Sequence, residues 1–180
     1  MSAPVQLKPV QLKPVQLKIV LVDSEPEVWR QVVVPAEVTL TDLHEIIQRA
    51  MGWERLHDYS FQVGLGADRR AVSNEKLLAD ALQMAGDLPF YYNYDSESGW
   101  RHRLVAEPLA EDRPNRLPVC VAGAAACPPE GTGGVWGYDR LLVRLEDMED
   151  PDYVELLDRY GDFDPDAFDL SSINARLLAT

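Results

Sequence analysis

The sequence predicts an α+β fold in which one central helix covers a sheet. Three observations predict it. Residues 39–53 combine a helix cap, a helical apolar period and a stop signal, the segments on either side are rich in β-branched and aromatic residues, and the last third returns to helical spacing. With 180 residues, of which 46% are hydrophobic, the chain is long enough for one compact domain.

The central helix is marked at both ends. Thr39 and Asp42 have the spacing of a capping box, and Gly52 is a natural left-handed terminator. His44 lies at the edge of the apolar stripe, where a hydrogen-bonded core histidine is favoured over a catalytic or ligand role. The stripe consists of Leu40, Leu43, Ile46, Ile47, Ala50 and Met51.

Residues 4–18 are three perfect copies of the pentapeptide PVQLK. Each copy opens with proline, which removes an amide donor, so residues 1–15 are interpreted as a low-complexity arm that is extended or disordered. The third copy continues into VQLKIVLVD, which places the first strand near Gln16 and an α+β domain over residues 16–180. The copies either exchange in that strand or recruit a partner, or they are a tandem duplication without a role.

Further strands and one helix follow in order. Residues 28–33 alternate as a second strand, which forms a hairpin with the first across the turn at 24–27. Residues 59–64 form a third strand after the central helix, and 65–70 are its exit loop. This order is typical of a β-grasp, so we expect a β-grasp-like mixed sheet. Ser73 or Asn74 is expected to cap a second helix, and 89–95 with 99–107 form a second hairpin.

The C-terminal part is predicted to be helical after a long loop. Residues 108–137 are rich in Pro, Gly and Ala and read as a lid loop, whose TGGVWGY segment serves turns or approaches a ligand. Residues 138–147 and 151–161 then form two helices, and a short helix closes the chain.

Charge and composition restrict the function classes. Seventeen basic and thirty acidic residues give a net charge of -13, which disfavours direct nucleic-acid binding. Arg101 and Arg103 would share one strand face without forming a broad patch. We expect no membrane span and no secretory signal, and therefore a cytoplasmic protein whose Cys120 and Cys127 remain thiols.

Several stretches together resemble the plasmid pRiA4b Orf-3-like family, also known as insertion-element passenger proteins. They are VQLKIVLVDSEPEVWR, TLTDLHEIIQRAMGWERLHDYSF, YNYDSESGWRH, CVAGAAACPPEGTGGVWGY and FDPDAFDLSSIN. The resemblance implies an α+β domain of mobile-element origin, with no activity, cofactor or substrate to carry over. The chain departs from the family pattern at residues 96–98 and at Gly131, where two acidic positions are missing.

The sharpest chemical hypothesis is a zinc site. It would use His102, Cys120 and Cys127, with His57 or Glu130 as a further ligand, although six residues between the cysteines exceed the usual structural spacing. Otherwise these thiols are small buried hydrophobes. A hydrolase reading recruits Asp95, His102 and Glu130. The candidate binding residues are Tyr94, Asp95, Trp100, His102 and Glu130.

The competing interpretation, which we favour, is a non-enzymatic accessory or interaction protein that binds a protein partner. At least three of the four tryptophans are expected in the core. An exposed tryptophan beside a cleft lined by His57 and His102 would favour a chemical site. A surface without convergent polar groups would favour interaction.

Overall fold

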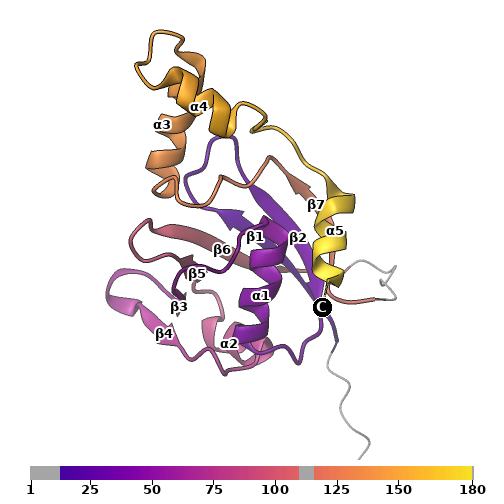
Figure 1. Ribbon diagram of the computed structural model, residues 1–180. Coiled ribbons are helices and arrows are strands. Elements are labelled where there is room, and N and C mark those ends of the chain that lie inside the picture. Colours follow the sequence, from indigo (N-terminus) through magenta and orange to yellow (C-terminus); the bar gives the residue numbers. More distant parts are fainter. Residues whose placement is uncertain (1–12, 110–115, 180) are drawn as a thin grey trace, which may run out of the picture.

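The computed structural model describes residues 13–109 and 116–179, so most of the repeat arm lies outside the described residues. Within them, a seven-stranded sheet has the order β4-β3-β5-β6-β1-β2-β7 (Figure 1). The strands are β1 (Val15–Leu21), β2 (Trp29–Val34), β3 (Tyr59–Val63), β4 (Arg70–Val72), β5 (Phe90–Tyr94), β6 (Trp100–Glu107) and β7 (Val119–Ala124). The helices are α1 (Leu40–Met51), the 3₁₀ turn η1 (Gly66–Asp68), α2 (Leu78–Ala85), α3 (Gly134–Glu146), α4 (Tyr153–Tyr160) and α5 (Leu170–Leu178).

Helix α1 confirms the prediction made from its cap and stripe. Asp42 N–H donates to the Thr39 hydroxyl, Thr39 N–H donates to the Asp42 carboxylate, and Gly52 adopts φ 89° at the end of the helix. All six stripe residues are buried. The helix therefore holds the sheet through its apolar face, as the sequence predicts.

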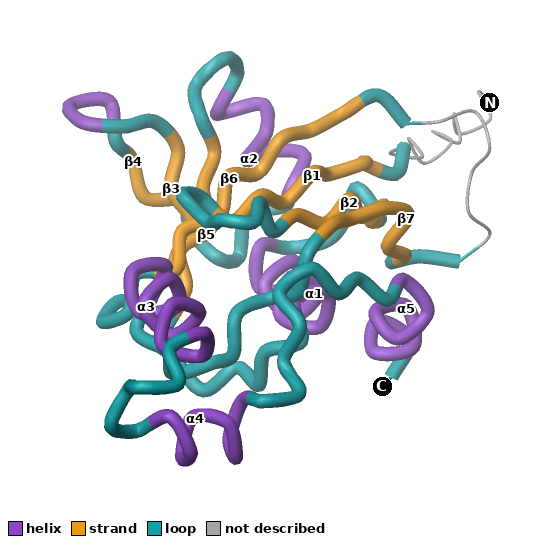
Figure 2. Tube along the Cα trace, turned by 90° about the horizontal axis from the view of Figure 1, so that it is seen from above, coloured by secondary structure: helices purple, strands orange, loops and turns teal. Residues whose placement is uncertain are grey.

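Strand register divides the side chains into two faces. Leu17, Ile19 and Leu21 of β1 are fully or almost fully buried, while the residues between them are partly exposed. The buried face continues through Leu104 opposite Ile19 and through His102 opposite Leu21. Figure 2 shows α1, α3, α4 and α5 on one side of the sheet. The hydrophobic core lies between α1 and that face.

The expected mixed sheet is not observed, because all six strand pairings are antiparallel. β1 has antiparallel partners on both sides, β2 and β6, so it has no free edge for a parallel neighbour. The strand after α1 instead pairs with β4 and β5. The α+β class is confirmed, whereas the parallel strand pair that a mixed sheet requires is not observed among the described residues.

Two short strands lie in segments that the sequence assigns to loops. β4 has only three residues, too few for a readable alternation. β7 consists of small residues inside the predicted lid loop, and it pairs with β2. Gly123 is required there, because an added Cβ would lie 2.4 Å from the Phe168 ring and 2.8 Å from the Trp29 carbonyl oxygen.

The remaining helix boundaries differ in ways that tertiary contacts explain. α2 begins at Leu78 rather than after Ser73, because Leu77 bridges to Thr39 and Leu78 N–H donates to the Val38 carbonyl. α3 begins at Gly134 and so includes most of the predicted turn segment. Among the described residues, none of these helices has the length and apolar character needed to span a membrane.

Candidate functional site

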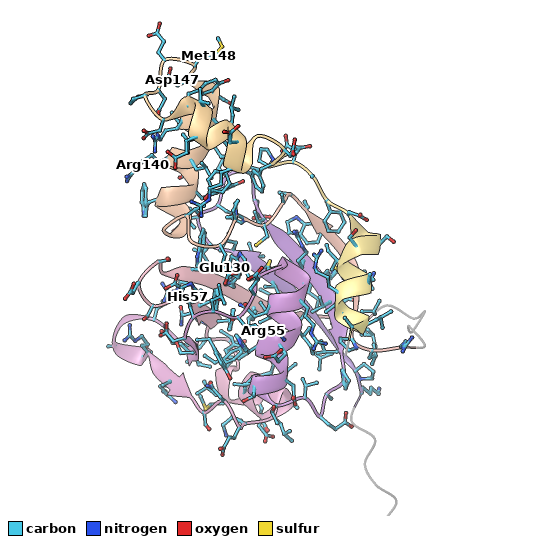
Figure 3. The ribbon with its side chains drawn as sticks, viewed as in Figure 1. Arg55, His57, Glu130, Arg140, Asp147 and Met148 are labelled. Atoms are coloured by element: carbon cyan, nitrogen blue, oxygen red, sulfur yellow. The ribbon has the colours of Figure 1, made fainter. Side chains whose placement is uncertain are left out.

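Three connections meet where β5 turns into β6. They are residues 52–58 after α1, the turn 95–99, and residues 128–132 before α3. The Trp53 indole N–H donates to the Pro128 carbonyl at 2.9 Å, and Ser96 N–H donates to the Asp58 carboxylate at 3.0 Å. Figure 3 shows His57 and Glu130 at this junction.

Glu130 joins two of these connections. One carboxylate oxygen accepts the Glu54 N–H at 2.8 Å, and the other accepts the Tyr94 hydroxyl. The same hydroxyl oxygen accepts the Leu56 N–H at 3.0 Å. Burial, with the Glu130 carboxylate beside it, raises the pKa of Tyr94 above its ordinary value. The Tyr94 hydroxyl is therefore a hydrogen-bond donor fixed in place.

Asp95 and His57 form a pair at the rim of the junction. The His57 Nδ1 lies 3.8 Å from the Asp95 Oδ1, and the side chains are 39% and 6% exposed. Burial alone would raise the pKa of Asp95, but hydrogen bonds from Ser98 and Glu97 and the neighbouring His57 hold this pKa below its ordinary value. Asp95 adopts φ 55°, the left-handed conformation that asparagine and aspartate tolerate in turns.

The start of α3 closes against the same turn. Gly134 adopts φ 76°, and an added Cβ would lie 2.1 Å from the Ser98 carbonyl oxygen. Only glycine allows this approach. The turn 95–99 therefore packs against the start of α3, while Ser96, Glu97 and Gly99 stay exposed. The Asp95 carboxylate is occupied in organising its own turn.

A buried polar cluster lies beneath the junction. Gln48 donates to the Tyr92 hydroxyl oxygen at 2.9 Å, and that hydroxyl lies 2.7 Å from His44 Nδ1. Because Gln48 supplies the donor, the Tyr92 O–H is free to donate to His44, which then carries its proton on Nε2. Burial lowers the pKa of His44, and its ring stacks on Tyr59 at 3.6 Å. His44 is the hydrogen-bonded core histidine that the sequence predicts.

His102 and Trp100 lie deeper, with both side chains fully buried. Among the described residues, neither ring nitrogen of His102 has a hydrogen-bond partner. The indole N–H of Trp100 has none there either. Burial lowers the pKa of His102 to about 3, so the ring is neutral at ordinary pH. His102 is packed against Trp53 and Tyr92, with ring centroids 5.3 and 5.4 Å apart.

The two cysteines are held in separate places. Cys120 lies on β7, where its N–H and C=O bond to the Asn174 side chain and its thiol donates to the Ala122 carbonyl at 3.3 Å. Cys127 lies in the following connection, and burial raises its pKa to about 12. Burial also raises the pKa of Cys120. Both side chains are therefore thiols rather than thiolates at neutral pH.

Arg30 is a buried residue that sequence reasoning missed. Its guanidinium donates to the carbonyl oxygens of Trp29, Ala50, Ala124 and Ala125, and so joins β2 to the end of α1 and to β7. Burial lowers its pKa, although an arginine remains charged. The available signal is its alternation with Val28 and Val32 on the apolar face of the strand.

The predicted site residues thus form two groups. Tyr94, Asp95, His57 and Glu130 meet at the junction, whereas Trp100 and His102 lie in the core below it. In residues 13–109 and 116–179, no three or more His, Cys, Asp and Glu side chains gather as a metal site would require. His102 is fully buried while Trp136 is 82% exposed, so these residues do not line a common cleft with His57.

Two of the four tryptophans, not three, are buried. Trp53 and Trp100 are 6% and 0% exposed. Trp29 is partly exposed on the sheet face opposite α1, and Trp136 extends from α3 into solvent. The expectation that at least three lie in the core is therefore wrong, because two of them are on surface-facing sides of their elements.

Comparisons with known proteins match most of the chain to relatives over most of their own length. A family model described as plasmid pRiA4b ORF-3-like protein matches residues 13–172. An uncharacterised protein, y4hQ of Sinorhizobium fredii, is 36% identical over 165 residues, covering 83% of each chain. The crystal structure of MM3350, a protein of unknown function from Methanosarcina mazei Go1, superposes with a TM-score of 0.76 at 31% identity, covering 87% of this chain and 95% of that one.

Proposed function

This chain belongs to the plasmid pRiA4b ORF-3-like family, and we propose that it is a non-enzymatic accessory protein of mobile-element origin that binds a partner protein through its α3–α4 hairpin. The observation that carries the proposal is the 82% exposure of Trp136 on that hairpin. The plasmid in the family's description supports the mobile-element origin. The sheet and α1 then form the scaffold that presents the hairpin.

The hairpin has few contacts of its own with the core. α3 buries Gly134, Tyr138 and Leu141, and no residue of α4 is buried. Figure 1 shows both helices projecting beyond the sheet. Arg144 holds the turn between them by donating to Asp150 at 2.7 and 2.9 Å and to Asp152.

The hairpin exposes large apolar side chains among its charged residues. Trp136 and Val143 are seven residues apart, two helical turns, and so share a face of α3. Val143, Met148 and Val154 are 68%, 79% and 72% exposed. Exposed apolar clusters mark interaction surfaces, and tryptophan is enriched among the residues that dominate binding energy.

An apolar cleft between the two helices adds to this surface. It has a volume of about 270 Å³ and is suited to one or two apolar side chains. Figure 3 shows Met148 and Asp147 at the tip of the hairpin and Arg140 along α3. The residues lining the cleft include Leu142, Leu145, Leu157, Tyr160, Phe163 and Pro165.

Affinity capture with the full chain as bait tests the proposal. The bait is compared with Trp136→Ser/Val143→Ser, and with Leu65→Ser as a matched control, since Leu65 is 46% exposed but lies outside the hairpin. We expect a protein that the wild type and the control capture and the double variant does not. Equal capture by all three baits, or no specific capture by the wild type, would refute a hairpin-mediated interaction.

The alternative is a metal-binding protein or metal-dependent hydrolase that uses the His57, His102, Cys120, Cys127 and Glu130 side chains. The His57–Asp95 pair near Glu130 is the observation in its favour. Metal analysis of the purified protein distinguishes the two functions. Near-stoichiometric zinc would favour the alternative.

A further inference from the structure

The sheet face opposite α1 carries the basic side chains of two central strands. Figure 2 shows α1, α3, α4 and α5 on the other side of the sheet. β1 contributes Lys18 and β6 contributes Arg101 and Arg103, all between the buried positions of their strands. This cationic face is unexpected in a chain with a net charge of -13.

Strand register places the three cations around one point. Arg103 lies opposite Val20 on one side and opposite Tyr91 on the other. Lys18 lies opposite Val105, so it is a diagonal neighbour of Arg103, about 7–8 Å away between Cα atoms. Arg101 is two residues along the same strand and shares its face. Among the described residues, none of the three forms an ion pair.

The nearby aromatic rings are already covered by these cations. The Lys18 ammonium lies 4.7 Å from the Trp29 ring centre, and the Arg101 guanidinium lies 4.4 Å from that of Tyr91. Single-stranded nucleic acids need such rings free for base stacking. The Arg101 Nε–H is enclosed and has no acceptor in the described part of the chain. The face also carries the carboxylate of Glu107, which accepts a hydrogen bond from Gln31. With three cations against this one carboxylate, the face offers net positive charge and donors rather than a stacking platform.

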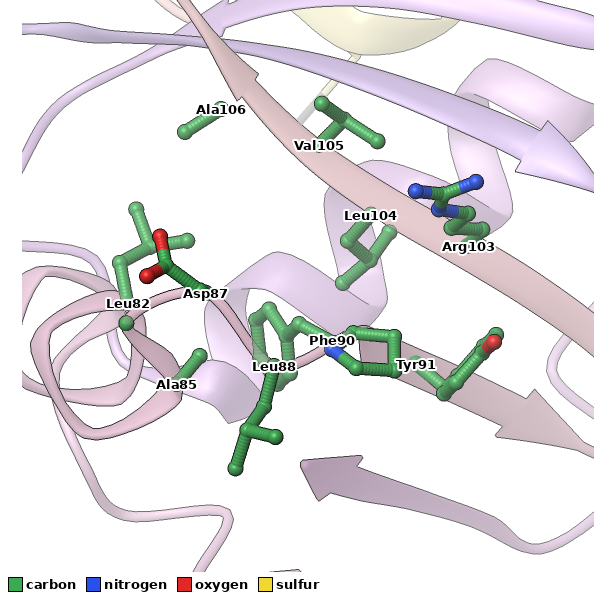
Figure 4. Close-up of a pocket in the computed structure, with 12 residues that line it drawn as sticks. Leu82, Ala85, Asp87, Leu88, Phe90, Tyr91, Arg103, Leu104, Val105 and Ala106 are labelled. Carbon is green, nitrogen blue, oxygen red and sulfur yellow. The ribbon is translucent and has the colours of Figure 1, made fainter. Parts of the chain in front are cut away.

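A cleft of about 510 Å³ adjoins the cationic face. β6 continues past β5 here, because Val105–Glu107 pair with β1 but the pairing with β5 ends at Leu104. Figure 4 shows Arg103 at one side of the cleft, Asp87 and Leu82 at the other, and Leu104 and Leu88 between the two sides. An unpaired strand edge beside a partly apolar cleft is suited to an extended peptide.

We propose that Lys18, Arg101 and Arg103, with the cleft beside β6, bind an extended acidic peptide segment of a partner protein. The peptide carboxylates contact the three cations, and its apolar side chains enter the cleft between α2 and β6. Charge complementarity selects an acidic partner, and the covered rings disfavour nucleic acid. This surface uses none of the hairpin residues, so it is independent of the function proposed above.

Fluorescence anisotropy with the full chain tests the proposal. The probes are a labelled peptide of alternating Glu and Val, a Lys–Val peptide and labelled oligothymidine. We expect the Glu–Val peptide to bind most tightly, and Arg101→Glu/Arg103→Glu to weaken its binding at least about tenfold, because two attractive contacts become repulsive. Ala106→Trp, which fills the cleft without changing charge, should also weaken binding.

Arg69→Glu/Arg70→Glu is the matched control, since it changes net charge equally at exposed positions outside the face. It should alter the affinity for the Glu–Val peptide less than about twofold. If the double sheet variant does not fold, as judged by circular dichroism, the exposed position is tested alone with Arg103→Glu.

Four results would overturn the proposal. They are no preference for the Glu–Val over the Lys–Val peptide, an equal loss of affinity in the control variant, tighter binding of oligothymidine, and self-association of the protein that depends on Arg101 and Arg103. The third would identify the face as a nucleic-acid surface, and the fourth as an interface between copies of this chain.

Discussion

Acidification of the protein gives a direct measure of the burial of His102. Its folded pKa is about 3, whereas an unfolded histidine titrates near about 6.5. The folded state excludes a proton that the unfolded state takes up. The contribution of neutral His102 to the free energy of unfolding is therefore complete above the unfolded pKa and is lost as pH falls below it. Between about pH 7.5 and about pH 5 the loss from one such histidine is about 2 kcal/mol.

The assay is thermal and urea unfolding of wild type and His102→Phe at both pH values. Phenylalanine fits a site where neither ring nitrogen has a partner in the described structure. For a chain of this size the wild type should lose about 4–8 °C more in melting temperature than the variant on acidification. Burial also lowers the pKa of His44, which adds a loss common to both proteins.

The reasoning fails if His102→Phe loses as much stability as the wild type between these pH values. That result would mean that His102 accepts a proton in the folded state. The test compares how much stability the wild type and His102→Phe each lose on acidification. Titrations that the two proteins share cancel in this difference.

Three further predictions concern packing and local conformation. Tyr92→Phe should lower the free energy of unfolding by about 2–4 kcal/mol in urea titrations, because it leaves the buried His44 and Gln48 side chains without their partner. The control Tyr59→Phe should lower it by less than about 0.5 kcal/mol. Equal effects of the two substitutions would contradict the hydrogen-bonded cluster. Gly134→Ala should cost more than about 2 kcal/mol because of its clash and positive φ, against about 1 kcal/mol for Gly131→Ala, which has open space around it. Deletion of residues 4–13 should change unfolding by less than about 0.5 kcal/mol, since the third PVQLK copy remains to form β1; a marked loss in circular dichroism melts would show that the earlier copies stabilise the fold.

The first strand shows why some of the fold could be predicted. The sequence places its start near Gln16, and β1 begins at Val15. Only the third repeat is followed by apolar residues, and a shift of the strand by five residues would put Pro14 at the buried position of Ile19. Composition and order along the chain therefore exclude the other copies from that place in the sheet.

Within the candidate site, the reach of sequence reasoning was shorter. The sequence offers Tyr94, Asp95 and Glu130 as candidate binding residues but does not show which of them touch. The hydrogen bond between Tyr94 and Glu130 joins residues 36 apart in the chain, so no local pattern predicts it. The sequence offers His102 as a metal ligand because histidine is a common zinc ligand. Its position opposite Leu21 and Tyr92, on the buried face of a central strand, could be read only from strand pairing.

What the sequence by itself determined is local: the capped helix α1, the hairpins β1–β2 and β5–β6, and the amphipathic spacing of the C-terminal helices. These depend on residues within a few turns or one tight connection of each other. Only the tertiary structure decided the antiparallel order of seven strands, the burial of Arg30, the meeting of Glu130 with Tyr94, the exposure of Trp136 and the gathering of three cations on one sheet face. Each of these depends on which distant segments lie side by side. The local sequence of a segment does not determine which strand or helix packs beside it.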